Sequence, residues 1–370
     1  MRTMSQAAVP VDERRAAALE VLTTGVVGDD VAERVTWSVI RLLDGSGAAL
    51  ALDDADLDAA RSFAASERIG GIVHRVAPGV AATDVASLAG AIDIERRLLS
   101  TIDLLEAARV PTLVLKGNAT ARLDHRSPED REVGDVDVLV RPEDLTTAMA
   151  ALVRQGHRHA VTHPFSTSAF FHSETFVHPD GIEIDLHHRL SQPSRPPTSC
   201  WADPAPFELG GRTLLALPRP WRFLHALVHQ MMNPPPSQRA VNGLTDLVVM
   251  WRAGVDLDRV RSAAAEIGTT EIVERGLRRV TDLLGDAPPP PTAPQPVPRS
   301  RVERRFAAAL DTAGPTPGYL ALAANLAVQP VRMWTRYLAE LVWPSAAYRR
   351  ELGITPTGQL RHVVNEALGR

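Results

Sequence analysis

Two short segments of the 370-residue chain hold carboxylates among residues that favour strands. Asp135 and Asp137 lie in the valine-rich run 133–140, where aspartate is disfavoured and therefore needs a reason. Residues two apart on a strand share a face and lie about 7 Å apart, so both carboxylates can reach one metal cluster. Other Asp-x-Asp pairs precede helical runs and are explained by helix capping. They lie at 54–56, 56–58 and 256–258.

The segment 182–187 alternates strictly between apolar and ionisable residues. Glu183, Asp185 and His187 fall on one face of the expected strand, and the apolar residues fall on the other. Burying three ionisable groups is unfavourable unless they are paired or bound to metal. A solvent-facing edge strand is the alternative interpretation, but the presence of Asp135 and Asp137 favours a functional site.

Asp135, Asp137 and Asp185 together match what Mg²⁺-dependent phosphoryl chemistry requires. Mg²⁺ (or Mn²⁺) prefers oxygen ligands, and two such ions can activate an attacking hydroxyl and neutralise a leaving pyrophosphate. A further carboxylate can accept the proton of that hydroxyl. We therefore predict a magnesium or manganese site formed by these three residues.

Lys116 is the single lysine of an arginine-rich chain. It follows the β-branched run 110–115 and precedes Gly117. Chance survival under a preference for arginine is one explanation. The other is that a compact ammonium is needed at this position, where a planar guanidinium would not fit.

Residues 108–217 are expected to form a small α/β (α+β) core with a mixed sheet. Short β-branched or alternating runs predict its strands, a segment beginning at 118 predicts one helix, and Pro142 begins another that ends at 154. The expected strands are 110–115, 133–140, 170–177 and 181–187.

Helical patterns flank this core on both sides. We expect a helical N-terminal region over 1–107 and a helical region packing on the core over 218–285. A proline-rich connector, 286–300, then leads to a helical C-terminal tail, 301–370. The expected helices are 31–43, 55–65, 85–108, 221–232, 244–251, 257–284, 302–310 and 319–342.

Aromatic, arginine and apolar residues gather in the tail segment 319–343. Packing on the helical half of the same chain is the simpler interpretation. Contact with a partner protein or a membrane surface is the alternative, since aromatic and arginine residues favour interfaces.

The overall composition is that of a globular protein with a formal net charge of −4, which argues against non-specific nucleic-acid binding. No apolar run approaches the roughly 18 residues of a membrane span, and the first ten residues lack a signal-peptide core. Cys200 is the single cysteine, which excludes an intrachain disulfide and a zinc site built on cysteines. A cytoplasmic location is expected.

Histidines crowd residues 157–188 but match no zinc-protease spacing. We expect these imidazoles to line a pocket near the carboxylates, with His187 steadying Asp185 or approaching an acceptor substrate. Serine-hydrolase and P-loop motifs are absent from the sequence. The clustered histidines are His157, His159, His163, His172, His178, His187 and His188.

The segments Leu115-Lys-Gly117, Arg131 to Val140 and Ile182 to His187 resemble the uncharacterised bacterial nucleotidyltransferase family of the DNA polymerase β-like superfamily. The resemblance implies that Gly117 is the glycine that opens a helix near a triphosphate. It also implies that Asp135 and Asp137 are the metal pair, with Asp185 as third ligand and base.

Further site residues follow from the same resemblance. Lys116 and Arg131 would contact the triphosphate, and His229 and Asp246 match a downstream helical region. Asn118 stands where many members of the superfamily have serine, and its amide is expected to donate to phosphate in place of the hydroxyl.

The implied activity is metal-dependent transfer of a nucleoside monophosphate from a nucleoside triphosphate, such as ATP, to an acceptor hydroxyl or phosphate. A small molecule, a peptide or a saccharide is the expected kind of acceptor. Two alternatives are a non-catalytic nucleotide-binding or interaction protein of the same fold and a toxin–antitoxin-like phosphotransferase module.

Overall fold

The computed structural model describes most of the chain from residue 11 to residue 361. The described residues are 11–23, 30–47, 50, 52–80, 85–166, 168–192, 194–232, 240–286, 326, 331–355 and 357–361. The expected helix 302–310 and almost all of the expected proline-rich connector lie outside them.

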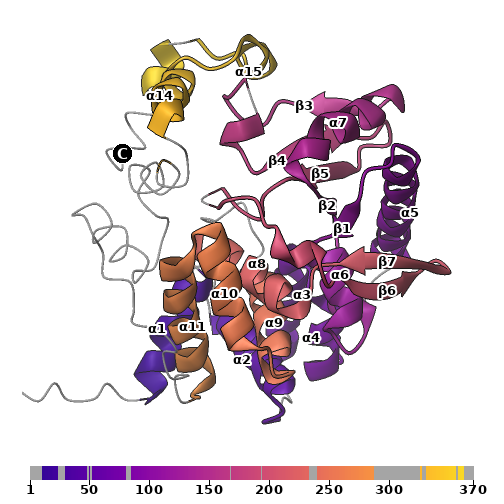
Figure 1. The fold of residues 1–370 in the computed structure, drawn as a ribbon. Coiled ribbons are helices and arrows are strands. Elements are labelled where there is room, and N and C mark those ends of the chain that lie inside the picture. Colours follow the sequence, from indigo (N-terminus) through magenta and orange to yellow (C-terminus); the bar gives the residue numbers. More distant parts are fainter. Residues whose placement is uncertain are drawn as a thin grey trace, which may run out of the picture.

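A seven-stranded mixed sheet, with strand order β3-β4-β5-β2-β1-β7-β6, forms the centre of the fold (Figure 1). Strand β2 pairs in parallel with β5 and antiparallel with β1, and β1 pairs in parallel with β7. The strands are β1 (Thr112–Val114), β2 (Val136–Val140), β3 (Arg158–Ala160), β4 (Ser173–Val177), β5 (Glu183–His187), β6 (Ala205–Leu209) and β7 (Arg212–Ala216).

One face of the sheet is covered by α5 (Val85–Ala107) and α7 (Leu145–Arg154). Val136 and Val138 of β2 are fully buried in this layer together with Ile184 of β5. Because side chains alternate along a strand, burying these valines directs Asp137 to the opposite face.

The opposite face of the sheet packs on a helical unit that draws on both halves of the chain. Leu113 and Leu139 of the sheet belong to the same hydrophobic cluster as Leu224, Leu247 and many other residues of these helices. The helices are α1 (Val11–Thr23), α2 (Asp30–Asp44), α8 (Arg219–Met232), α9 (Ala240–Arg252), α10 (Leu257–Ile267) and α11 (Thr270–Leu284).

Two further helices, α3 (Asp54–Glu67) and α4 (Gly70–Val76), share a hydrophobic cluster with α2 and with Val241 of α9. The short helix α6 (Lys116–Leu123) follows β1 and packs on α8. In Figure 1, α3 and α4 lie below the sheet, on the side of the helical unit, and α6 lies beside β6 and β7.

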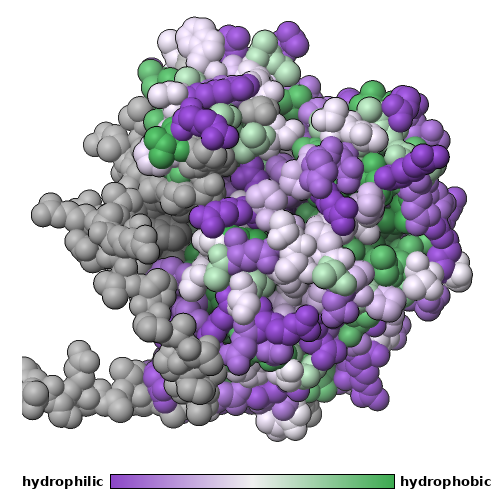
Figure 2. All heavy atoms as spheres, viewed as in Figure 1, coloured by the Kyte–Doolittle hydropathy of each residue, from purple (hydrophilic) through white to green (hydrophobic). Residues whose placement is uncertain are grey.

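The C-terminal helices α14 (Trp334–Val342) and α15 (Ala346–Leu352) lie near β3 and β4. Tyr337 is buried against Phe165 and Phe170, and Ser166 donates two hydrogen bonds to Glu340. Trp343 is 61% exposed, and hydrophobic and hydrophilic residues lie side by side over these helices in Figure 2. Part of the segment 319–343 thus packs on its own chain.

The predicted fold class is confirmed, while several predicted elements differ in detail. The single helix predicted over 257–284 is wrong, because Gly268 adopts φ 79° and ends α10 before α11 begins. Strands β3, β6 and β7 were not predicted, since their short sequences carry weak alternation. None of the described helices is both long and apolar enough to cross a membrane.

Asp124 ties the end of α6 to α8 through a fully buried carboxylate. Its two oxygens accept hydrogen bonds of 2.7 and 2.8 Å from the guanidinium of Arg222. Arg219 adds a third contact at 3.3 Å. This pairing fixes the end of α6 to the helical unit.

Replacing Asp124 with alanine should lower the free energy of unfolding by about 3–5 kcal/mol, because the buried Arg222 loses its counter-charge. Asp103→Ala is the matched control: it breaks an exposed pair with Arg212 and should cost at most about 1 kcal/mol. Urea unfolding of both variants measures the difference. Equal losses would contradict the structural role of Asp124.

Candidate active site

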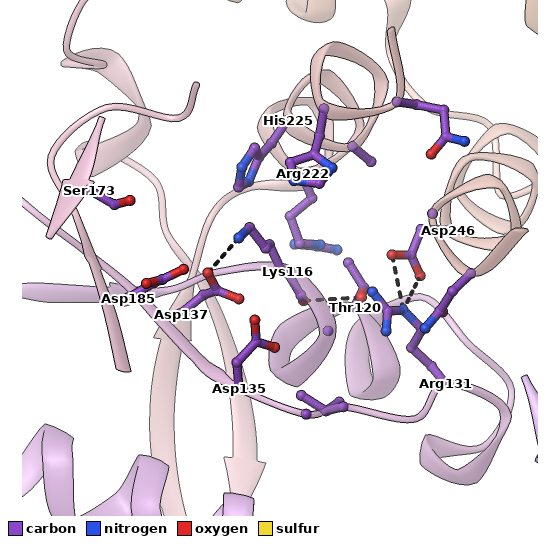
Figure 3. Close-up of a pocket in the computed structure, with 18 of the residues that line it drawn as sticks. Lys116, Thr120, Arg131, Asp135, Asp137, Ser173, Asp185, Arg222, His225 and Asp246 are labelled. Carbon is purple, nitrogen blue, oxygen red and sulfur yellow. Dashed lines mark hydrogen bonds and ion pairs between the residues drawn. The ribbon is translucent and has the colours of Figure 1, made fainter. Parts of the chain in front are cut away.

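A cavity of about 410 Å³ opens where the sheet meets α6, α8 and α9 (Figure 3). It is lined on the sheet side by carboxylates and on the helix side by basic and imidazole groups. The polar residues at its wall include Arg68, Lys116, Thr120, Arg131, Asp135, Asp137, His172, Ser173, Thr175, Asp185, Arg222, His225, His229, Gln230, Asn242 and Asp246.

The carboxylates meet because β2 and β5 are adjacent. Asp137 and Asp185 are direct partners in the parallel register of the two strands. Asp135 lies one residue before β2 and also faces the cavity. Ligand atoms of Asp137, Asp185 and His187 all lie within 4.8 Å of one another.

His187 does not line the cavity, but it forms a hydrogen bond with Asp137 from behind the cavity wall. Its Nε2 lies 2.9 Å from Oδ1 of Asp137, and its ring is fully buried. Because an ionised carboxylate can only accept, His187 is the donor in this bond. Thr175 of β4 holds Asp185 in the same way, donating its hydroxyl to Oδ1 at 2.7 Å.

Lys116 begins α6 and points directly at the carboxylates, with Nζ 2.6 Å from Oδ1 of Asp137 (Figure 3). Its backbone adopts φ 44°, a left-handed conformation that is unfavourable for a residue with a side chain. Such strain is often found at functional sites. The single lysine of the chain is therefore held in a strained turn against the most buried carboxylate of the cavity.

The opposite charges of Lys116 and Asp137 determine the protonation states of both residues. Burial on its own would raise the pKa of Asp137, but Lys116 and a hydrogen bond from His187 outweigh it and hold that pKa well below its usual range. Burial likewise opposes the charge of Lys116, but Asp137, Asp135 and Asp185 raise its pKa. The pair is therefore ionised at neutral pH.

The pKa of Asp135 shifts in the opposite direction from the pKa of Asp137. The neighbouring charge of Asp137, followed by burial, raises the pKa of Asp135, while Lys116 and Arg68 act to lower it. Two carboxylates this close resist joint ionisation unless cations gather around them. The site therefore favours added positive charge.

The residues predicted beside the triphosphate are only partly brought to the cavity. Gly117 and Arg131 line it, but Asn118 does not: its amide donates to the backbone carbonyl of Asp135 at 2.9 Å. The amide thus shapes the turn before β2, and the expected donation from Asn118 to phosphate finds no support in this geometry.

Arg131 is held in place by Asp246 of α9. Its Nε lies 3.0 and 3.1 Å from the two oxygens of Asp246, and His125 contacts the same carboxylate at 2.8 Å. Burial opposes ionisation of Asp246, but Arg131 and His125 lower its pKa overall. Asp246 therefore lies at the cavity wall as the partner of Arg131.

His229 lines the cavity, whereas Glu183 does not. Glu183 is exposed at the start of β5, where it pairs with Val177 of β4. Glu183 lies on the same face of β5 as Asp185. It is two residues earlier along the strand, and there the face is no longer part of the cavity wall. Strand alternation alone does not distinguish these two positions.

The expectation that the clustered histidines line the pocket is mostly wrong. Only His172 lines the cavity, and His187 lies directly behind Asp137. His159 and His163 instead share the carboxylate of Glu174, at 2.8 and 3.3 Å. The remaining three do not line the cavity: His157 and His178 make a ring contact with each other, and His188 is buried.

Several cavity residues were not predicted from the sequence. His225 was missed, although it lies four residues before the predicted His229 on α8, a spacing that places both on one helix face and that was a usable signal. Arg222 precedes His225 by three residues and shares that face. Thr120 and Arg68 carry no comparable signal.

The mixed sheet and the carboxylates on adjacent strands define a nucleotidyltransferase-like protein. The chain belongs to the uncharacterised nucleotidyltransferase family, which matches residues 89–285. No match was found among curated proteins.

Two solved structures show distant likeness. The antibiotic-resistance factor ANT(2'')-Ia has 13% identity and a TM-score of 0.32, with 46% of this chain and 88% of that chain covered. An antigenic nucleotidyltransferase-like protein from Paracoccidioides brasiliensis has 11% identity and a TM-score of 0.32, with coverage of 52% and 91%.

Replacing Lys116 with methionine should raise the pKa of Asp137 toward its ordinary range, because the main opposing charge is lost. Stability should fall toward the lower end of about 3–5 kcal/mol, since the lysine side chain is 24% exposed. The pair stabilises the fold above about pH 4, the pKa of an unfolded aspartate, and below about pH 10, where unfolded lysine deprotonates.

Carbon-13 titration of the aspartate carboxyls and urea unfolding from pH 3 to pH 7 measure both effects. The stability gap between parent and variant should shrink as pH falls below about 4. Arg75→Met, which disrupts the pair with Asp130, should leave the Asp137 titration unchanged. An unaltered Asp137 titration in Lys116→Met would refute the electrostatic coupling.

Proposed function

We propose that this protein is an enzyme that transfers a nucleoside monophosphate from a nucleoside triphosphate to an acceptor hydroxyl or phosphate, with Mg²⁺ or Mn²⁺ as cofactor. The pairing of Asp137 with Asp185 on adjacent parallel strands, facing Lys116 across 2.6 Å, carries this proposal. Membership of a nucleotidyltransferase family supports it.

The donor set fits a divalent ion. Asp137 and Asp185 present oxygen atoms close together, and Asp135 lies beside them at the cavity wall. These three carboxylates would hold the metal, while His187 orients Asp137 from behind through its Nε2. A bound divalent ion supplies charge that stabilises the phosphates and the leaving pyrophosphate.

Basic groups opposite the carboxylates suit the phosphates of the donor. Lys116 is a compact cation at the start of α6, where free backbone N–H groups also favour anions. Arg131 is oriented by its two contacts with Asp246. Gly117 lies between Val133 and Arg131 with little free space, so that α6 approaches this loop closely.

In the proposed reaction the acceptor oxygen attacks the α-phosphorus, and the bond from that phosphorus to the pyrophosphate breaks. Asp185 accepts the proton of the acceptor hydroxyl. Its Oδ1 is engaged by Thr175 at 2.7 Å, which leaves the other oxygen of the carboxylate to act. The products are the nucleotidylated acceptor and pyrophosphate.

Imidazoles line the acceptor side of the cavity. Burial, followed by the charge of neighbouring groups, lowers the pKa of His172 and of His225 well below the ordinary range. Neutral rings can accept or donate hydrogen bonds to an uncharged hydroxyl. A hydroxyl-bearing small molecule, peptide or saccharide fits this lining, and the cytoplasm supplies the triphosphate.

Incubation with Mg²⁺ and each labelled triphosphate, followed by a screen of cell extract for labelled acceptors, tests the activity directly. Label in a new product, with release of pyrophosphate, is the expected result. Triphosphate binding with no transfer to any acceptor would favour the alternative of a non-catalytic nucleotide-binding protein.

Asp137→Asn should lose metal and triphosphate affinity together, because Asp137 is the carboxylate that both Lys116 and His187 hold. We expect at least about a tenfold loss in each, as for a lost charged ligand. Calorimetric titration with Mn²⁺ and then with ATP measures it. Glu183→Gln is the control: it removes an exposed acid at the start of the adjacent strand β5, and no effect is expected.

Chelation of the divalent ion should weaken binding of ATP to the parent protein to a similar extent. Equal ATP affinity with and without metal would contradict the role of the carboxylates. So would a loss in Glu183→Gln that equals the loss in Asp137→Asn.

Asp185→Asn should keep the fold and much of the nucleotide affinity, while single-turnover transfer falls by at least roughly 100-fold. The amide is nearly isosteric and can still contact Thr175, but it cannot take the proton of the acceptor. The labelled acceptor from the screen serves as substrate. Near-parental transfer would remove Asp185 as the base and make His172 the next group to test.

A further inference from the structure

Arg68 lines the cavity although it lies 21 residues before the part of the chain that matches the family. It is the residue that follows α3, in the N-terminal helical region. The family match therefore does not account for a guanidinium at this site, and neither does any sequence motif.

Gly134 leaves the space that the guanidinium of Arg68 occupies. A Cβ atom added to Gly134 would overlap Nη1, Cζ and Nη2 of Arg68. The arginine head group therefore occupies the space that a side chain at residue 134 would fill, immediately before Asp135. Gly134 does not need left-handed backbone, since its φ lies outside that region. Its lack of a side chain serves the close approach of Arg68.

The backbone of Arg68 is fixed on both sides. Arg68 itself adopts φ 54° and caps α3 through its N–H to Ala64 and Ala65. On one side Glu67 accepts a hydrogen bond of 2.8 Å from the N–H of Val241 in α9. This contact anchors the end of α3 to the helix that carries Asp246.

On the other side, Gly70 donates its N–H to Glu132 at 3.1 Å. Arg75 of α4 pairs at 2.6 Å with Asp130, whose side chain is 2% exposed. Asp130 and Glu132, in the loop that leads to Asp135, are therefore tied directly to α4. The strained turn at Arg68 is held between two anchored elements, as expected for a positioned functional group.

The cations of the cavity differ in how they are engaged. Lys116 bonds Asp137, Arg131 bonds Asp246, and Arg222 bonds Asp124. Arg68 lines the same cavity, and its guanidinium lies against Gly134, immediately before Asp135. It thus adds a planar, bidentate donor next to the acidic cluster, a geometry that suits phosphate oxygens.

We propose that Arg68 binds the phosphate groups of the nucleoside triphosphate, so that the N-terminal helices complete the active site. This inference rests on the proposed nucleotidyltransferase function. It goes beyond that function by assigning substrate binding to residues outside the segment that matches the family, and by giving Gly134 the role of admitting the guanidinium.

A double-mutant cycle between Arg68 and Gly134 tests the proposal. Arg68→Ala should weaken binding of ATP and of inorganic pyrophosphate, each with Mg²⁺, by about 10- to 100-fold, as for lost charge-assisted hydrogen bonds. Gly134→Ala should weaken both to a similar extent, because its methyl group displaces the guanidinium. The double variant should bind no more weakly than Arg68→Ala alone.

Three comparisons distinguish this role from a structural one. Mn²⁺ affinity without nucleotide should stay at the parental level in Arg68→Ala, in contrast to Asp137→Asn. Arg68→Lys should recover part of the pyrophosphate affinity because it keeps a cation. Arg61→Ala, which removes an exposed arginine of α3 that pairs with Asp58, is the matched control and should bind like the parent.

Circular dichroism and thermal unfolding confirm that each variant is folded before binding is measured. Parental affinity in Arg68→Ala, or additive losses in the double variant, would overturn the proposal while leaving the proposed function intact. A parent protein that binds neither ATP nor pyrophosphate would instead overturn the proposed function, and this inference with it. Recovery in Arg68→Lys together with non-additivity in the cycle would support it.

Discussion

Strands β2 and β5 run side by side in parallel, and their register sets Asp137 directly opposite Asp185. A slip of one residue would turn either carboxylate toward the layer formed by α5 and α7, where Val136 and Val138 now pack. The valines therefore hold the register through burial, and the carboxylates depend on it. Lys116, His187 and Thr175 can engage the two aspartates only in this register.

The same sheet face changes from core to cavity within two residues. Leu139 belongs to the hydrophobic cluster shared with the helical unit, whereas Asp137, two residues earlier on that face, lies at the cavity. The helices that seal Leu139 also supply His225, His229 and Asp246 to the cavity wall. Stability and site geometry thus come from one packing arrangement between the sheet and the helices.

Local patterns in the sequence were sufficient to identify β2 and β5, the two strands at which the carboxylates lie, but not the whole sheet. Asp137 and Asp185 stand out because aspartate is unusual in strands, and the structure places them on adjacent strands. Asn118 could not be interpreted correctly, since its partner is a backbone carbonyl 17 residues away. The same limit applies to Glu183, whose distance from the cavity depends on where the strand begins.

Arg68 and Arg222 illustrate the other limit. Both are ordinary surface-type residues by sequence, and their cavity positions result from contacts over long separations, such as Arg222 with Asp124. Helix boundaries were limited for a similar reason: Gly268 fits within an apolar periodic run, yet its left-handed backbone ends α10. Local hydrophobic periodicity does not indicate which distant residue a side chain pairs with. It also does not indicate where the backbone adopts a positive φ.

The pairs that cross from the sheet to the helical unit also bear on how the chain acquires its structure during synthesis. Asp124 and Arg131 emerge from the ribosome well before their partners Arg222 and Asp246. At about 5–20 residues per second, on the order of ten seconds separate the two halves of each pair. Nascent chains of this protein therefore carry Asp124 and Arg131 before their partners have been synthesised, and the last of these partners, Asp246, arrives with α9.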